Sequence, residues 1–170
     1  PTVASVDLAR YAGSWYEITK LPNRFQKQCV ADTQAEYRLD GDVVRVINRC
    51  RTEDGKIDDI KGRAKVVPDS GNAKLKVTFF CPFYGDYWVL ALDPDYRWAM
   101  IAGNDRSYLW ILARDKQLPQ AVLDPLLQQA KALGVKFLYN QTIEKLVVDA
   151  GAIKGVMVNG ELLTADQYVL

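Results

Sequence analysis

Hydrophobic and polar residues alternate with a period of two from Trp15 to Arg114, in short runs separated by Gly, Pro, Asp and Asn. Successive side chains of a β-strand point to opposite faces of a sheet, so this pattern is typical of half-buried antiparallel strands. Within residues 31–39, one parity is small or apolar and includes Ala31, Ala35 and Tyr37, while the other parity is polar or charged. The pattern therefore predicts an all-β region.

Eight such runs follow one another through short turns, near residues 13–20, 30–39, 43–50, 59–67, 74–80, 86–92, 97–103 and 107–113. Eight antiparallel strands can close into a barrel that holds one small ligand, and closure removes the unpaired edges of an open sheet. A sandwich of two sheets is the alternative that alternation alone leaves open. We expect an eight-stranded, antiparallel up-and-down barrel.

One amphipathic helix is expected after the last strand. The runs 87–92 and 108–113 are apolar on both parities, which indicates strands covered on both faces. After Pro119, apolar residues recur at helical spacing, and Gly134 follows where a helix commonly ends. We expect this helix to pack outside the barrel. We also interpret Asp124 as a second N-cap and Pro125 as the proline of the first helical turn after it, so that a short turn is separated from the main helix.

Composition and charge exclude several classes of function. The 22 basic and 21 acidic residues nearly cancel, so an electrostatically driven nucleic-acid binder is not expected. Histidine, the commonest general base and zinc ligand, is absent, and we expect no metal, no cofactor and no catalytic residue. Apolar runs fall short of the roughly 18 residues that a spanning helix needs. We expect a water-soluble domain, and a chain that begins at Pro1 is consistent with a removed signal or lipid anchor.

The three cysteines lie in predicted strands, without the short spacing of a metal or redox pair. If residues 30–39 and 43–50 pair across the turn at Asp40 and Gly41, Cys29 and Cys50 meet at the open end of that hairpin. We expect a disulfide there. Two small apolar thiols in a reducing compartment are the alternative, and Cys81 has no partner in either case.

Three motifs occur in order before the helix. They are Gly-Ser-Trp from Gly13 to Trp15, Ala-Leu-Asp-Pro-Asp-Tyr with Asp93 and Tyr96, and Tyr-Leu-Trp-Ile-Leu-Ala-Arg ending at Arg114. Together they resemble the three sequence motifs of the lipocalin family. The stretch Val-Thr-Phe-Phe-Cys-Pro-Phe-Tyr-Gly at 77–85 is similar to bacterial outer-membrane lipocalins, called Blc, and to apolipoprotein D.

The resemblance covers residues 6 to 134 and implies an eight-stranded barrel with one helix outside it. It also implies that Trp15 and Arg114 meet at the narrow end, where the guanidinium stacks on the indole and bonds backbone carbonyls. We therefore assign Gly13, Trp15, Asp93, Tyr96 and Arg114 to the structure of the barrel. None of them is expected to catalyse a reaction.

A ligand cavity is expected inside the barrel, because small residues such as Ala35, Gly62 and Ala64 leave space that a solid core would fill. Polar contacts would come from Asn48 and from tyrosines, and the cations of residues 20–27 could meet a head group, although a solvated loop is the simpler reading. The alternative is that the aromatic side chains only fill a core. The predicted ligand contacts are Ala35, Tyr37, Val46, Asn48, Ala64, Val77, Phe79, Tyr87, Val89, Tyr108 and Trp110.

The lipocalin resemblance implies binding, storage or transport of a fatty acid, lysophospholipid or similar amphiphile, in the periplasm or outer membrane of a bacterium. No catalysis is expected, since no histidine is present to activate the thiol of Cys81. A lipocalin-type enzyme and a protein-interaction module are the alternatives. Membrane association would come only through a removed lipid anchor.

Residues 135–170 form a strand-rich tail that the resemblance does not explain. Residues 136–139 could add a strand, and turns near 150–152 and at Asn159-Gly160 predict hairpins. The tail resembles a segment of flavin-dependent D-amino-acid oxidoreductases, but no Gly-x-Gly-x-x-Gly fingerprint is present. We expect an appended, fusion-derived segment rather than a flavin enzyme or an independent domain. Its strands could pair with a second copy of the chain.

Overall fold

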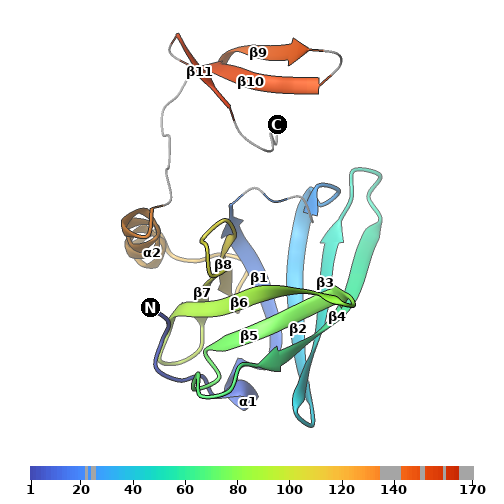
Figure 1. Cartoon of the computed structure of the whole chain (residues 1–170), viewed down its shortest axis with the longest axis vertical. Helices are drawn as coiled ribbons and strands as arrows, with labels where there is room; N and C mark the ends of the chain where they lie inside the picture. Colours follow the sequence, from blue (N-terminus) through green and yellow to red (C-terminus); the bar gives the residue numbers. More distant parts are fainter. Residues whose placement is uncertain (22, 24–25, 135–142, 150–151, 159, 165–170) are drawn as a thin grey trace.

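The computed structural model describes residues 1–21, 23, 26–134, 143–149, 152–158 and 160–164. Eight antiparallel strands form a closed barrel in which each strand pairs with the next and β8 returns to β1 (Figure 1). The strands are β1 (Gly13–Lys20), β2 (Ala31–Asp40), β3 (Val43–Arg51), β4 (Ile57–Val66), β5 (Lys74–Phe80), β6 (Phe83–Leu92), β7 (Trp98–Ala102) and β8 (Leu109–Ala113). The predicted up-and-down barrel is confirmed, and the two-sheet sandwich is wrong.

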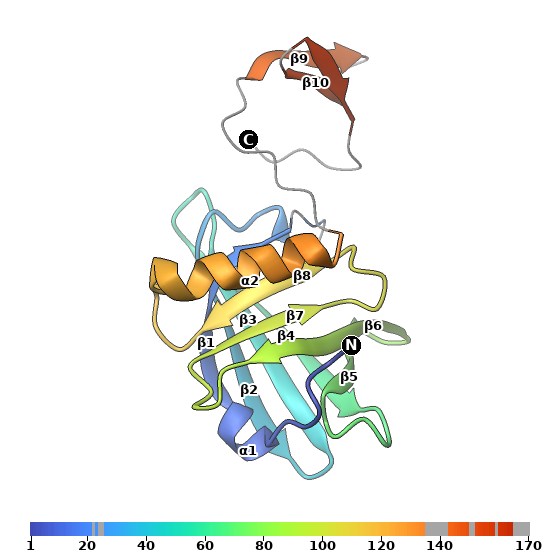
Figure 2. The ribbon, with the colours of Figure 1, turned by 90° about the vertical axis from the view of Figure 1, so that its left-hand side faces the viewer.

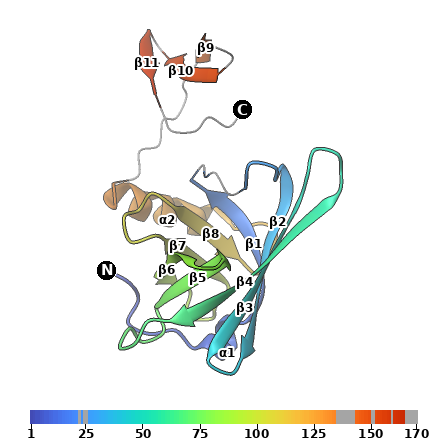
Figure 3. The same cartoon turned by 45° about the vertical axis from the view of Figure 1, so that its right-hand side comes forward.

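The two ends of the barrel differ. Connections in an up-and-down barrel alternate between its ends, so the turns after β1, β3, β5 and β7 share one end. The other end is covered by the short helix α1 (Leu8–Tyr11), which directly precedes β1 and which Asp7 caps by accepting hydrogen bonds from the backbone of Ala9 and Arg10. Figure 3 shows the β3–β4 turn at the end opposite α1. We call these the open end and the closed end.

Helix α2 (Gln120–Ala132) lies across the outside of the barrel wall (Figure 2). Its Leu126 and Ala130 are buried against outward-facing residues of three consecutive strands, Leu90, Met100, Ala102, Leu109 and Ile111. The expected external helix is confirmed. This packing also explains why strands β6 and β8 are apolar on both faces.

The predicted break at Asp124 and Pro125 is wrong, because α2 runs continuously through Pro125. The carboxylate of Asp124 does not cap a second helix, but accepts a hydrogen bond from the side-chain amide of Gln120, one turn earlier. A proline inside a helix removes one backbone hydrogen bond. Burial of Leu126 and Ala130 on the barrel keeps the helix continuous in spite of that loss.

The alternation fails at the start of β2, where Ala31 is exposed instead of facing the interior. The pairing register with β3 shifts between Ala31 and Gln34, and Asp32 has a positive φ of 53°. A bulge of this kind turns the preceding side chain to the other face, because side-chain direction has a period of two. From Ala35 onward the predicted parity holds.

The first and third motifs meet at the closed end, as expected. The guanidinium of Arg114 lies 3.9 Å from the ring centre of Trp15, whose side chain is fully buried. The same guanidinium donates to the backbone carbonyls of Arg10, Tyr11, Ala12, Ser14 and Tyr96. Gly13 has a φ of +97°, and a Cβ atom there would lie 3.2 Å from Arg114 Nη1. Only glycine combines that backbone conformation with such a close approach.

The second motif forms the turn between β6 and β7. The side chain of Asp93 is 5% exposed and accepts hydrogen bonds from the backbone of Asp95 and Arg97 and from the guanidinium of Arg97. Tyr96 adopts a φ of +60°, and its hydroxyl accepts a hydrogen bond from the backbone of Asp7. This turn therefore ties the N-terminal segment to the barrel.

Replacing Asp93 with asparagine is expected to lower the free energy of unfolding at pH 7 by about 2 kcal/mol, because a buried, charge-assisted network is lost. The hydrogen bonds from Arg97 hold the pKa of Asp93 below its ordinary value. The carboxylate thus stabilises the fold above the unfolded-state pKa of about 3.9 and loses this effect as the pH falls through its lower folded-state pKa. Urea unfolding from pH 7 to pH 3 should show the difference between the two proteins shrinking. A constant difference would contradict this role.

The tail contains a three-stranded antiparallel sheet in the order β11-β10-β9, from β9 (Ile143–Asp149), β10 (Ala152–Val158) and β11 (Glu161–Leu163). The expected strands of the hairpins are therefore present. The turn residues 150, 151 and 159 and the strand expected at 136–139 lie outside the described residues. Among the described residues, no helix is long and apolar enough to cross a membrane.

Candidate functional site

The inward-facing side chains of the barrel form one apolar cluster that contains most of the predicted ligand contacts. Tyr37, Val46, Ala64 and Val89 are buried in it, and Ala35, Val77, Phe79, Tyr87 and Trp110 pack against it while partly exposed. Asn48 is half-buried and lies opposite Ala35 in the β2–β3 ladder, and the ring of Tyr108 stacks on Trp110 at 6.0 Å. The structure brings these residues together, and their contact with a ligand stays a prediction.

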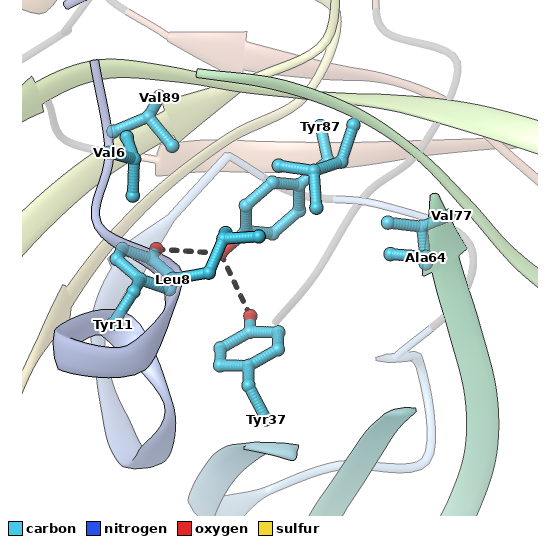
Figure 4. A pocket seen from close by; sticks show the side chains of 9 residues that line it. Val6, Leu8, Tyr11, Tyr37, Ala64, Val77, Tyr87 and Val89 are labelled. Atoms are coloured by element: carbon cyan, nitrogen blue, oxygen red, sulfur yellow. Dashed lines mark hydrogen bonds between the residues drawn. The ribbon is translucent and has the colours of Figure 1, made fainter. Parts of the chain in front are cut away.

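The part of this interior next to the closed end holds a cavity of about 20 Å³ (Figure 4). Strands β2, β4, β5 and β6 supply part of its wall. The rest comes from the N-terminal segment and α1 through Val6, Leu8 and Tyr11. The chain before β1 therefore forms the floor of the barrel.

Three tyrosine hydroxyls are the polar groups of this floor. The Oη atom of Tyr87 lies 2.8 Å from Oη of Tyr11 and donates to Oη of Tyr37 at 2.9 Å. Burial raises the pKa of Tyr37 to about 12, and burial likewise raises the pKa of Tyr11 and of Tyr87 well above 10. All three hydroxyls therefore stay uncharged at neutral pH.

A cluster of polar side chains lies toward the open end. Its members come from β1, from β8 and from the connection after β1. The carboxylate of Glu17 accepts hydrogen bonds from Lys20 at 2.7 Å and from the side-chain amide of Gln26 at 2.8 Å. The Gln26 oxygen in turn accepts hydrogen bonds from Asn23 and from the indole of Trp110. The hydrogen bond from Trp110 to Gln26 holds the indole ring against the inner wall, and the ammonium group of Lys20 balances the negative charge of Glu17.

Phe79 occupies space that the sequence assigned to a ligand. A Cβ atom on Gly62 would lie 2.7 Å from Cδ1 of Phe79 and 2.6 Å from the backbone oxygen of Thr78. The expectation that Gly62 leaves room for a ligand is therefore wrong, since the Phe79 ring packs directly over it. Ala35 and Ala64 are the other two small residues of the expectation, and both lie in the inner cluster.

Large apolar side chains are exposed around the open end. At the β5–β6 turn, Phe80 is 70% exposed and Phe83 is 78% exposed, and Ile57 at the start of β4 is 56% exposed. The free thiol of Cys81 lies in the same turn and is exposed. In the predicted loop of residues 20–27, Lys20 is paired with Glu17 and Arg24 lies outside the described residues.

The expected disulfide is confirmed. Cys29 and Cys50 are bonded, with their Cα atoms 5.4 Å apart, and the alternative of two free thiols is wrong. The bond ties the connection after β1 to the end of β3. Because Gln26 lies in that connection, the disulfide also holds the partner of Trp110 near the open end.

Several site residues were not predicted from the sequence. Tyr11, Val6 and Leu8 precede the first strand, and only the chain's return across the closed end brings them to the cavity. Glu17 shares the inward parity of Trp15 and could have been found by extending the alternation along β1. Gln26 lies in an irregular connection, where no periodic signal exists.

Comparison with known proteins agrees with this architecture. The profile of the family described as "Lipocalin-like domain" matches residues 6–142. Temperature-induced lipocalin-1 of Arabidopsis thaliana is 42% identical over 137 residues, which cover 75% of this chain and 73% of that protein. The outer membrane lipoprotein Blc of Escherichia coli is 38% identical over 143 residues, covering 82% and 81%.

Apolipoprotein D of Macaca fascicularis is 37% identical over 133 residues, which cover 73% of this chain and 69% of that protein. The crystal structure of insecticyanin from Manduca sexta superposes with a TM-score of 0.64 at 30% identity, covering 78% of this chain and 77% of the other. The family match extends to residue 142, eight residues beyond the expected boundary at 134. The chain is therefore a member of the lipocalin family.

Proposed function

We propose that the barrel binds, stores or transports one small hydrophobic or amphiphilic molecule, such as a fatty acid or a lysophospholipid. One observation carries this proposal: the interior wall is apolar, is closed at one end by α1 and is bordered at the other end by exposed apolar side chains. The apolar body of the ligand would contact Ala35, Val46 and Val77. A charged head would stay near water at the open end, because a charge buried without a partner is very costly.

Binding without catalysis fits the described interior better than an enzyme does. Glu17, the carboxylate of the polar network, is already paired with Lys20 and Gln26, so it is not poised as a general base. The buried tyrosines are neutral, and the chain contains no histidine. Cys81 is exposed at the open end, and no histidine is present to activate its thiol. A lipocalin-type enzyme therefore has no observation that favours it.

We place this activity in the cell envelope of a bacterium. Relatives named outer membrane lipoproteins share up to 38% identity with this chain, although plant and animal proteins are similarly related. The disulfide between Cys29 and Cys50 favours an oxidising compartment such as the periplasm. The part of the predicted tail beyond the family match, residues 143–170, would be an appendage to the barrel, and pairing of its strands with a second copy stays a prediction.

Filling the barrel tests the proposal. Phenylalanine at Ala35 should weaken binding of a fluorescent fatty acid at least tenfold, because the new ring projects into the interior. Phenylalanine at the neighbouring Gln34, whose side chain points out of the barrel, is the matched control and should leave the affinity unchanged. Circular dichroism confirms that both variants are folded. Equal affinity of the two variants would contradict binding inside the barrel.

A further inference from the structure

A groove of about 410 Å³ opens on the outer face of strands β3, β4 and β5. The hydrogen-bonded ladder between β4 and β5 ends at Arg63 and Thr78, so the groove lies where these two strands part. Both residues line it, and their neighbours Ala64 and Val77 belong to the inner cluster. Because side chains of a strand alternate between its two faces, Arg63 and Thr78 point out of the barrel.

The lining of the groove carries more positive than negative charge. Arg45, Lys61 and Arg63 line it together with one carboxylate, Asp40. Arg45 forms an ion pair with Asp40, whereas Lys61 and Arg63 have no ion pair among the described residues. Arg63 also lies directly opposite Arg45 in the β3–β4 ladder, and like charges at such positions destabilise a sheet. An anion bound in the groove would relieve this repulsion.

A buried hydroxyl group lies beside these cations. Thr78 is directly opposite Arg63 in the β4–β5 ladder and is only 4% exposed. Its Oγ1 atom has no hydrogen-bond partner in the part of the chain that the structure describes. Buried hydroxyl groups of folded proteins nearly always have such a partner, so this atom is a donor that a bound group would satisfy. Side chains directly opposite each other have Cβ atoms about 5 Å apart, so one bound group can contact both residues.

These donors match a phosphate monoester better than a carboxylate. A guanidinium group binds two phosphate oxygens at once, and an ammonium group and a hydroxyl group each donate to a further oxygen. A phosphate monoester offers three terminal oxygens, and its charge of about −1.5 to −2 at neutral pH balances two cations. The volume of the groove leaves space for the organic group that the phosphate carries.

We propose that Lys61, Arg63 and Thr78 form a binding site for a phosphate monoester on the outer wall of the barrel. The two cations hold the charge of the phosphate, and the hydroxyl of Thr78 donates a hydrogen bond to one of its oxygens. This site is separate from the interior that takes the apolar ligand, and it does not depend on the carrier function. Soluble esters and lipid head groups both present this phosphate, and the experiment distinguishes the two sources.

Calorimetric titration of the full chain with glycerol 3-phosphate tests the soluble source, at neutral pH and constant ionic strength in a buffer free of phosphate. We expect saturable binding to one site. Lys61→Gln and Arg63→Gln should each weaken it at least about tenfold, because each removes a charge-assisted contact. Thr78→Val keeps the shape of the side chain and should weaken binding about three- to tenfold.

Lys65→Gln is the matched control. Lys65 is the next outward-facing cation of β4, is exposed and does not line the groove. Its replacement removes the same charge as Arg63→Gln, and the affinity should stay within about threefold of the wild type. Circular dichroism confirms that all four variants are folded.

Cosedimentation with vesicles tests the lipid source, using phosphatidylcholine with and without phosphatidic acid, whose head group is a phosphate monoester. Binding to the phosphatidic acid vesicles alone that is lost in Arg63→Gln would support the site and identify a lipid source. Binding of glycerol 3-phosphate without cosedimentation would support it and identify a soluble source.

Three results would overturn the proposal. They are absence of binding in both experiments, an equal loss of affinity in Lys65→Gln and Arg63→Gln, and unchanged affinity in Thr78→Val. The second result would show an effect of overall charge rather than a site. Failure of fatty-acid binding would contradict the carrier function and leave the phosphate site standing.

Discussion

Replacing Trp15 with alanine should lower the free energy of unfolding by about 3–5 kcal/mol, the largest effect expected for any single substitution in this chain. The side chain is fully buried, its indole nitrogen donates to the backbone oxygen of Tyr11 at 2.8 Å, and its ring supports the guanidinium of Arg114. Removing the ring leaves a cavity and exposes one side of that guanidinium. Since about 1 kcal/mol shifts the melting temperature of a chain of this size by roughly 2–4 °C, the midpoint should fall by about 6–20 °C.

Trp15→Phe separates the contributions of that side chain. It keeps a ring for Arg114 but loses the hydrogen bond to Tyr11, so a smaller loss of about 1–2 kcal/mol is expected. Calorimetric melting of the three proteins makes the comparison. Losses of equal size in the two variants, or a loss below 1 kcal/mol for alanine, would show that the contact between the first and third motifs does not hold the closed end.

Serine at both Cys29 and Cys50 should lower the free energy of unfolding by about 3 kcal/mol. The disulfide closes a loop with a sequence separation of 21, and a cross-link of that span restricts the unfolded chain by about this amount. The pair also anchors the connection that carries Gln26, the partner of Trp110, so ligand affinity should fall as well.

Serine at Cys81 is the matched control for this pair, because that thiol is free and exposed. It should leave both stability and affinity unchanged. A reducing agent added to the wild type should reproduce the loss seen in the double variant, as measured by thermal melting. Unchanged melting under reducing conditions would mean that the bond contributes nothing to the stability of the barrel.

The barrel could be predicted from the sequence because its signals are local. In β2, the parity that holds Ala35 and Tyr37 faces the interior as expected, and the motif residues Trp15 and Arg114 meet as expected. The predictions were wrong where a bulge or tertiary packing overrides the local sequence pattern. The bulge at Asp32 turns Ala31 outward, and packing on the barrel keeps α2 continuous through Pro125.

The floor and the hydrogen-bond network that joins Glu17, Gln26 and Trp110 could not be predicted in the same way, because they depend on contacts between distant parts of the chain. The hydroxyls of Tyr11 and Tyr87 are 76 positions apart in the sequence, and Gln26 and Trp110 are 84 apart. Gly62 illustrates the same limit, since its lack of a side chain accommodates the ring of Phe79 rather than a ligand. Periodicity assigns a residue to a face, but it does not show which neighbour fills the space.

The most direct test of the account is native mass spectrometry of the full chain after incubation with hexadecanoic acid and with a lysophospholipid, followed by titration of tryptophan fluorescence. We predict one bound molecule per chain and saturable quenching that is lost in Trp110→Phe, because that indole packs against the inner cluster of the barrel. The Ala35→Phe variant should lose the bound molecule. Absence of a bound amphiphile, or binding that persists unchanged in Ala35→Phe, would contradict the claim that this barrel is a carrier.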